Sequence, residues 1–219
     1  MSDSQLVGLA KDFFQNSLDS SPTSAIMRGH KKYFDQIEEL TEEQFQKEKE
    51  IVDTFIQRLN AIEKDNLTSR EKVTHGMLEF ALSSNKDSLL DRSWEFGAGV
   101  AGFTGFLIDY NQQMFVPDSE SADMMLKRLE LYKRLYTQIA DVQKLGLNNN
   151  RVATERNLLR TIDQLENYLA SSLDQDPLLL VNFSPEISDS EISEWKDKAK
   201  KIIEVNIRPT VSAYLDQLK

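Results

Sequence analysis

The glycines of WEFGAGVAGFTG, residues 94–105, have the spacing of a dinucleotide-binding turn. Gly97, Gly99 and Gly102 match G-x-G-x-x-G, a pattern in which the backbone closes on a pyrophosphate at the start of a helix. That fold also needs a buried strand before the glycines and a helix after them. Here the polar stretch DRSWEF precedes them and the aromatic stretch FTGFLIDYNQQMFVP follows. We therefore interpret the segment as a glycine-rich extended stretch or turn, and not as a nucleotide site.

Metal ligands are scarce. The only histidines are His30 and His75, and the chain has no cysteine, so neither an H-E-x-x-H motif nor a thiolate zinc site can form. Glu71, His75 and Glu79 are spaced four apart on an expected helix and could share a face. Charged residues at this spacing are common on solvated helix faces, and an exposed surface is therefore favoured over a metal site.

Nucleophilic and acid–base chemistry have no clear residue set. No G-x-S-x-G motif occurs. The carboxylate pairs Glu38/Glu39 and Glu42/Glu43 lie in polar stretches, where solvation accounts for them. The aromatic residues at and after Trp94, and Trp195, are interpreted as core or interface anchors in preference to a ligand pocket. The residues alone therefore specify a helical protein with no visible catalytic set.

Apolar residues recur at helical spacing along most of the chain. The first helices are expected over 4–18 and from Ser21-Pro22 toward Arg28. The next helix is expected to start at Thr41, which forms a capping box with Gln44. Another is expected from Thr68, which forms a capping box with Glu71, to about Leu89. In that helix Val73, Met77 and Phe80 are expected to form the core stripe.

Three more helices are expected in the second half. One opens near Ser119 and stops at Gly146, and one carries a leucine stripe from Leu158 to Leu173. The last begins at Ser188, is kinked or broken at Pro209, and continues to the end of the chain. Only the segments Arg92–Phe115 and 176–185 lack this helical spacing of apolar residues. The sequence predicts an all-α array of antiparallel helical hairpins, forming one domain over residues 1–219, with a small extended or β-hairpin insertion near 92–115.

Composition limits the partners. The chain has 36 acidic and 26 basic residues, a net charge of −10, which disfavours nucleic acid and anionic membranes. The N-terminus lacks a signal-peptide pattern and no apolar run could span a bilayer. A cytoplasmic protein is expected, with no nucleic-acid or membrane partner.

Several segments, in order, resemble the bacterial family catalogued as domain of unknown function 885. SPTSAIMRGHKKYFD is similar to its Ser-Pro-x-x-Ala segment, and LNAIEKDNLTSREKVTHGMLEFAL is similar to its next leucine-rich helix and link. The glycine-containing excursion, the helices around ESADMMLKRLELYKRLYTQIADVQKLGLNNNRV, the DPLL stretch and the R-P-x-x-x-x-Y ending of IRPTVSAYLDQL follow in the same order.

The resemblance implies a helical, zinc-metallopeptidase-like protein whose zinc-binding half lies beyond this chain. No catalytic residue, metal ligand or cofactor of this chain is therefore expected, and the last helix, still apolar at Lys219, is expected to lead toward that half. The expected function is a non-catalytic wall of a peptide-substrate channel. A helical interaction domain with no enzymatic link is the alternative, and the expected partners are a peptide, the chain's own C-terminal half or a second copy. The expected cleft-lining residues are Trp94, Phe96, Gly97, Gly99, Gly102 and Phe103.

Overall fold

The computed structural model describes residues 5–96 and 111–219, and most of them are helical, which confirms the all-α class. The chain divides into two compact units. Unit 1 comprises Met1–Ser20 and Leu40–Trp94, and unit 2 comprises Ser21–Glu39 and Glu95–Lys219. The single domain expected over residues 1–219 stays a prediction.

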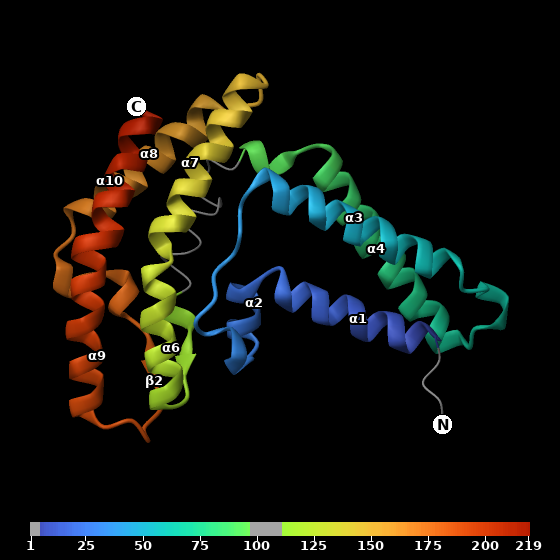
Figure 1. Ribbon diagram of the computed structural model, residues 1–219, viewed down its shortest axis with the longest axis horizontal. Helices are drawn as coiled ribbons and strands as arrows, with labels where there is room; N and C mark the ends of the chain where they lie inside the picture. The colour runs from blue at the N-terminus through green and yellow to red at the C-terminus, as the bar shows by residue number, and fades with distance from the viewer. Residues whose placement is uncertain (1–4, 97–110) are drawn as a thin grey trace. The chain divides into compact units, whose positions relative to one another are not determined.

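The described part of unit 1 is built on three α-helices, drawn in blue to green in Figure 1. They are α1 (Gln5–Asp19), α3 (Glu42–Asn60) and α4 (Ser69–Leu90). Both predicted starts are confirmed. The Thr41 side chain accepts a hydrogen bond from Gln44 N at the start of α3, and Thr68 and Glu71 form a complete capping box at the start of α4.

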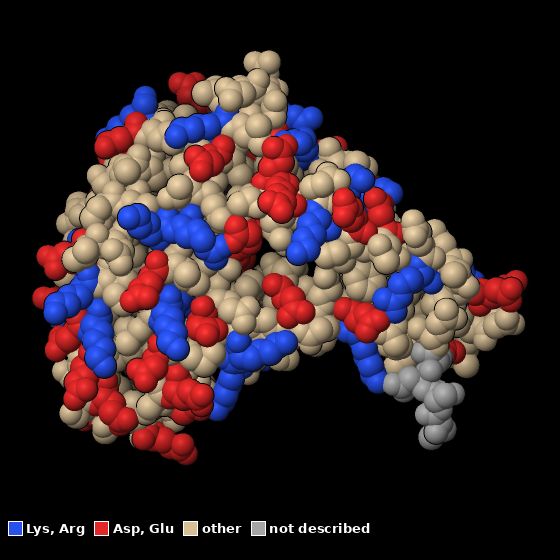
Figure 2. Space-filling view, in the orientation of Figure 1, with Lys and Arg blue, Asp and Glu red and all other residues tan. Residues whose placement is uncertain are grey.

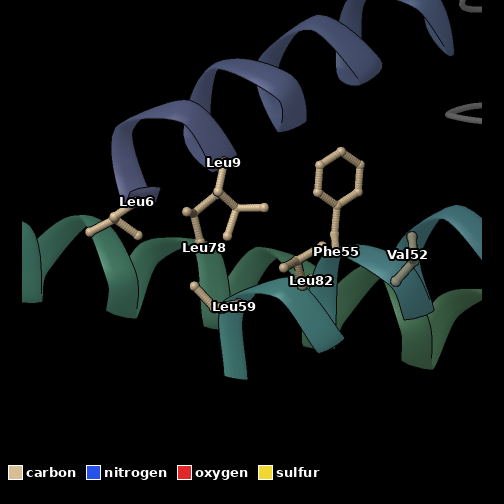
Figure 3. Packing of buried hydrophobic residues seen from close by; sticks show 7 residues of the cluster. All are labelled: Leu6, Leu9, Val52, Phe55, Leu59, Leu78 and Leu82. Atoms are coloured by element: carbon tan, nitrogen blue, oxygen red, sulfur yellow. The ribbon is translucent and has the colours of Figure 1, made fainter. Parts of the chain in front are cut away.

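Leucine side chains from all three helices build the core of unit 1. Leu6 and Leu9 of α1 lie over α3 and α4, which contribute the rest of the cluster (Figure 3). The other members are Val52, Phe55 and Leu59 of α3 and Leu78 and Leu82 of α4. Burial of this apolar surface is the main favourable contribution to the stability of the unit.

The helix α4 turns a different face to this core than the sequence predicts. Val73, Met77 and Phe80, the expected core stripe, are 62%, 69% and 76% exposed, whereas His75, expected on a solvated face, is 3% exposed. Both expectations are wrong for one reason. Apolar residues occur on two sides of α4, and the positions of α1 and α3 select the side with Leu78 and Leu82.

Unit 2 contains the other α-helices found among the described residues, and they enclose a second core. They are α2 (Pro22–Met27), α6 (Ser119–Glu130), α7 (Tyr132–Asn148), α8 (Glu155–Ala170), α9 (Asp189–Ile202) and α10 (Arg208–Leu218) (Figure 1). The expected helix over 119–146 is thus two helices that meet at Leu131. The capping box of Ser188 and Glu191 starts α9 as predicted.

Pro209 lies in the first turn of α10, where a missing N–H costs little. A π-helical turn, Ile203–Ile207, joins α9 to α10. Val211, Tyr214 and Leu215 of α10 are buried, in a helix that packs against α7 and α8. These apolar positions are therefore covered within unit 2.

The two non-helical connections pair with each other. Strand β1 (Phe115–Val116) is parallel to β2 (Asn182–Phe183), with hydrogen bonds from Asn182 N to Met114 O and from Ser184 N to Val116 O. The strand at the end of the predicted insertion therefore has its partner in the connection 176–185. At the start of the insertion, Ser93–Phe96 form a 3₁₀ turn.

Basic and acidic side chains alternate over the face of the molecule in view in Figure 2, with no purely basic region on that face. Among the residues described, none of the helices has both the length and the apolar character needed to cross a bilayer. The excess of acidic residues gives the surface a net attraction for cations.

Candidate functional site

Of the two predicted cleft residues that the structure describes, Trp94 and Phe96, Trp94 lines a cavity. Gly97, Gly99, Gly102 and Phe103 lie outside the described residues. Phe96 is 39% exposed and belongs to unit 2, whereas Trp94 belongs to unit 1. A role for these residues in substrate binding stays a prediction.

The Trp94 cavity lies within unit 1, where the end of α1 meets the start of α3 and the end of α4. Its volume is about 260 Å³, somewhat below the roughly 300–1,000 Å³ of pockets for drug-sized ligands. Its lining residues are Asn16, Ser20, Phe45, Glu48, Val52, Asn85, Ser88, Leu89 and Trp94. A space of this size suits one side chain or one small polar group.

The indole of Trp94 is held on its ring faces. The Phe45 ring stacks on it with centroids 4.2 Å apart, and the Arg92 guanidinium lies 4.6 Å from the indole centroid. Arg92 is itself fixed by an ion pair with Glu42 at 2.8 Å. These contacts are made to the ring faces and not to the ring edge. On that edge, the Trp94 Nε1 donor is buried without a hydrogen-bond partner among the described residues.

Glu48 is the only ionisable group in the lining. Burial raises the pKa of its carboxyl above the usual value, and a hydrogen bond from Gln44 Nε2 at 3.4 Å opposes the rise only in part. In the described part of the chain no basic side chain pairs with it. A half-buried carboxylate without a counter-ion is unfavourable, and a cation or strong hydrogen-bond donor beside it would relieve that cost.

The remaining lining groups add donors and acceptors. The side-chain amides of Asn16 and Asn85 make no hydrogen bond to any residue that the structure describes, and Val52 and Leu89 provide an apolar floor. The cavity therefore combines an acidic acceptor, an unpaired indole donor, neutral amides and an aromatic wall. These groups can bind and orient a ligand. The described lining also holds the Ser20 and Ser88 hydroxyls, but it includes no histidine or lysine that could activate them as nucleophiles.

A wider groove of about 630 Å³ runs between α1 and α3. Two charged side chains of its lining already pair with each other, since Arg58 and Asp12 form an ion pair at 2.6 Å. Its floor includes Ile51 and Phe55. The Trp94 cavity is the better candidate of the two because it holds an unpaired buried donor and a carboxyl with a raised pKa, and the described lining of the groove holds neither.

The acidic and imidazole groups spaced along α4 do not form a metal site. His75 Nδ1 lies 4.0 Å from Glu79 Oε2, but Glu79 accepts two 3.0 Å hydrogen bonds from Lys64. Glu71 is used in the capping box with Thr68. Across residues 5–96 and 111–219, no group of three or more metal-ligating side chains is suitably placed.

The first segment that resembles the family builds a buried polar network in unit 2. Thr23, of the SPTSA stretch, donates from its N and Oγ1 to the Glu38 carboxylate at 2.9 and 2.7 Å. Arg128, fully buried on α6, donates to Thr23 Oγ1 at 2.5 Å and to the Gln36 carbonyl. The expected solvation of Glu38 is therefore wrong, because this residue fixes the segment 21–39 to α6.

Two later segments that resemble the family are joined by a second buried network. Arg208, of the R-P-x-x-x-x-Y ending, donates from Nε and Nη2 to Asp176 Oδ2 at 3.1 and 2.9 Å. Asp176, of the DPLL stretch, is fully buried and also accepts from Leu178 N. Burial and the nearby Asp176 carboxylate raise the pKa of Tyr168 above its usual range. The pairing is structural, since it ties α10 to the connection after α8.

Glu95 anchors the start of the insertion in the same way. Its side chain is buried, its Oε1 accepts from Asn149 Nδ2 at 3.1 Å, and Arg151 Nε lies 3.7 Å from its Oε2. Gly146 permits this approach, because a Cβ there would lie 2.7 Å from the Glu95 carbonyl oxygen. Glu95, which follows Trp94 in the sequence, is thus bound to the turn between α7 and α8.

Sequence reasoning missed Phe45 and Glu48. The two residues lie one helical turn apart on α3, and Val52 continues the same face. An acidic residue within an apolar stripe was the available signal for a half-buried carboxylate. The contribution of Asn16 and Asn85 depends on how three helices meet, and no local pattern encodes it.

Comparison with known proteins identifies one family. A family model described as "Bacterial protein of unknown function (DUF885)" matches residues 22–219, which confirms the resemblance seen in the sequence. A search of curated proteins found no match. A search of solved structures also found none.

Proposed function

The chain belongs to the DUF885 family of bacterial proteins of unknown function, and we propose that it acts there as a non-catalytic helical domain that binds peptides. The observation that carries the proposal is the Trp94 cavity, with its unpaired indole donor and its half-buried Glu48 carboxylate. The family match includes every cavity residue of α3 and α4.

The chemistry of the lining favours a lysine side chain as the group that enters the cavity. Its ammonium group provides the positive counter-ion that the Glu48 carboxylate lacks. Its methylene chain can pack against the apolar side chains of Val52 and Leu89. A peptide carbonyl beside it can accept from Trp94 Nε1. The net charge of −10 attracts basic peptides at long range.

Calorimetric titration with matched peptides tests this proposal. The probes are acetyl-Gly-Lys-Gly-amide and the same peptide with norleucine in place of lysine, which removes the ammonium group and keeps the chain. We expect the lysine peptide to bind about tenfold more tightly or better, because a charge-assisted hydrogen bond contributes about 1.5–3 kcal/mol. Equal binding of the two peptides, or no binding, would contradict the proposal.

Variants of α3 locate the interaction. Glu48→Gln should reduce the preference for the lysine peptide to near zero while keeping the size of the side chain. Glu50→Gln is the matched control, because Glu50 is exposed on the same helix and lines the wider groove. A loss of lysine preference in both variants would point to a general charge effect and exclude the cavity.

The link to zinc-dependent peptidases is part of the same proposal and rests on the resemblance. The zinc-binding residues of such a protein would lie outside these residues, and the chain would shape access for the peptide. With zinc added, the chain should cleave no peptide. Turnover that a chelator abolishes would overturn the assignment of a non-catalytic role.

A helical interaction domain with no enzymatic link is the second candidate. The apolar face of α10 is not available for such an interaction, because it is buried on α7 and α8. The observation that favours this candidate is the exposed apolar stripe of Val73, Met77 and Phe80 on α4.

A further inference from the structure

The exposed face of α4 has the pattern of a helix that packs against another helix. Val73, Met77 and Phe80 are spaced by four and three residues and are exposed. The helical repeat places them on the opposite side of α4 from Leu78 and Leu82, which belong to the core of unit 1 (Figure 3). Water-exposed side chains of this size on one stripe are uncommon in a monomer and mark an interaction surface.

Three further residues extend the stripe in both directions. Arg70 precedes Val73 by three residues, and Ser84 and Asp87 follow Phe80 by four and seven. All three are exposed. Together the six residues have the alternating three and four spacing of the a and d positions in a heptad repeat, over most of the length of α4. The stripe is apolar at its centre and has opposite charges at its two ends.

We propose that this face binds a second copy of the chain, with the two α4 helices antiparallel. A two-fold axis between positions 77 and 80 places Met77 against Phe80 of the partner subunit, and Val73 against Ser84 of the partner subunit. It also places Arg70 against Asp87 of the partner subunit at each end. The stripe is thus complementary to itself in the antiparallel direction. A parallel pair would bring Arg70 against its own copy, and Asp87 likewise.

The residues that flank the stripe favour a close approach of two helices. On one side lie Gly76 and Ser83, and on the other Thr74 and Ala81, all of them small. A Cβ added at Gly76 would meet nothing within 4 Å, so the space beside the helix is open. Small residues let helix backbones come near each other.

The charges of this face also fit a second copy, although the chain as a whole carries a charge of −10. At the a, d, e and g positions of residues 69–90 the only charged residues are Arg70 and Asp87. Neither forms an ion pair within the part of the chain that the structure describes. The face is therefore neutral overall, and two copies can meet on it without the repulsion expected elsewhere on the surface.

The inference names the partner for the second candidate function and does not depend on the Trp94 cavity. Sedimentation velocity of the full chain over a range of concentrations tests it. We expect a reversible dimer, which Phe80→Glu abolishes. Leu159→Glu is the matched control, since Leu159 is an exposed leucine on α8, and this variant should still form the dimer. A chain that is monomeric at every concentration would overturn the inference.

Charge reversal tests the antiparallel register. Arg70→Glu places two acids together at both ends, and Asp87→Arg places two bases together. Each variant alone should dimerise roughly tenfold more weakly or worse. An equimolar mixture of the two variants should regain the wild-type affinity, because every end then pairs an acid with a base. A mixture no tighter than either variant would overturn the antiparallel register.

The same variants separate this inference from peptide binding. Neither Arg70 nor Asp87 lines the Trp94 cavity, so both variants should bind the lysine peptide as the wild-type chain does. A weakened dimer with unchanged peptide binding supports two separate surfaces. A loss of both together in either variant would overturn the separation and indicate a general defect of unit 1.

Discussion

The two units of the chain differ in where they keep their polar and apolar groups. Unit 2 holds buried or partly buried charged side chains in hydrogen-bonded networks, such as Arg208 with Asp176 and Arg128 with Thr23. In unit 1 the only fully buried polar side chain within the described residues is His75. Unit 1 instead leaves an apolar stripe exposed on α4 and an unpaired indole donor at its cavity. This difference is the basis for our proposal that ligands bind to unit 1 and that the polar networks of unit 2 are structural.

The largest expected effect comes from breaking a network of unit 2. Asp176→Ala leaves the Arg208 guanidinium without its carboxylate, in a setting where loss of one partner costs about 3–5 kcal/mol. The free energy of unfolding, from urea titration followed by circular dichroism, should fall by that amount. Asp174→Ala is the control, because its ion pair with Lys200 is exposed and solvent screens it. Similar losses in the two variants would remove the contrast between buried and surface pairs.

Replacement of a glycine by alanine should change the free energy of unfolding in opposite directions in the two units. Gly146→Ala places a Cβ 2.6 Å from the Arg151 carbonyl oxygen, and overpacking of this kind costs about 1–3 kcal/mol. Gly76→Ala enters open space on the exposed side of α4 and should stabilise the helix by about 0.5–1 kcal/mol. Thermal unfolding at a concentration where the chain is monomeric measures both. A loss of stability in the Gly76 variant would contradict the open face assigned to α4.

The smallest effect concerns two carboxyl groups whose pKa values move in opposite directions. Burial raises the pKa of Glu48 above 4.5, so the native state holds its proton more tightly than the unfolded chain. Stability therefore falls as the pH rises from 4.5 through the raised pKa. The hydrogen bond from Lys31 lowers the pKa of Asp118 to about 2. Its stabilising contribution is therefore lost as the pH falls from 3.8 through 2.

Carbon-detected NMR titration of the side-chain carboxyl groups measures both shifts. Glu48→Gln should remove the loss of stability seen above pH 4.5, because the amide has no charge to bury. A Glu48 carboxyl that titrates at or below its usual pKa would show that the cavity is better solvated than its lining indicates, and would weaken the case for an amine ligand.

Local patterns in the sequence were enough for most helices of both units. The capping residues Thr41, Thr68 and Ser188 each start a helix where expected, because a side chain that accepts a backbone N–H acts within one turn. The family resemblance, which depends on the order of such segments, was confirmed over residues 22–219.

The sequence could not predict which side of α4 is buried, or which residues pair with the buried charged side chains. Val73 and Leu78 are both apolar, and only the packing of α1 and α3 decides which of them is buried. Arg128 and Glu38 are far apart in sequence, and their network through Thr23 appears only when the segment 21–39 meets α6. The Trp94 cavity has the same origin, since its lining comes from three helices.

The two tryptophans provide the most direct test of the claim that binding belongs to unit 1. Trp94 lines the cavity with an unpaired Nε1, whereas Trp195 of unit 2 is buried and donates its Nε1–H to the Ala122 carbonyl at 2.8 Å. Their indole N–H resonances can be followed together while the lysine peptide is added. The Trp94 resonance should shift with saturation while that of Trp195 stays fixed. A saturating shift of Trp195 with Trp94 unmoved would contradict the assignment.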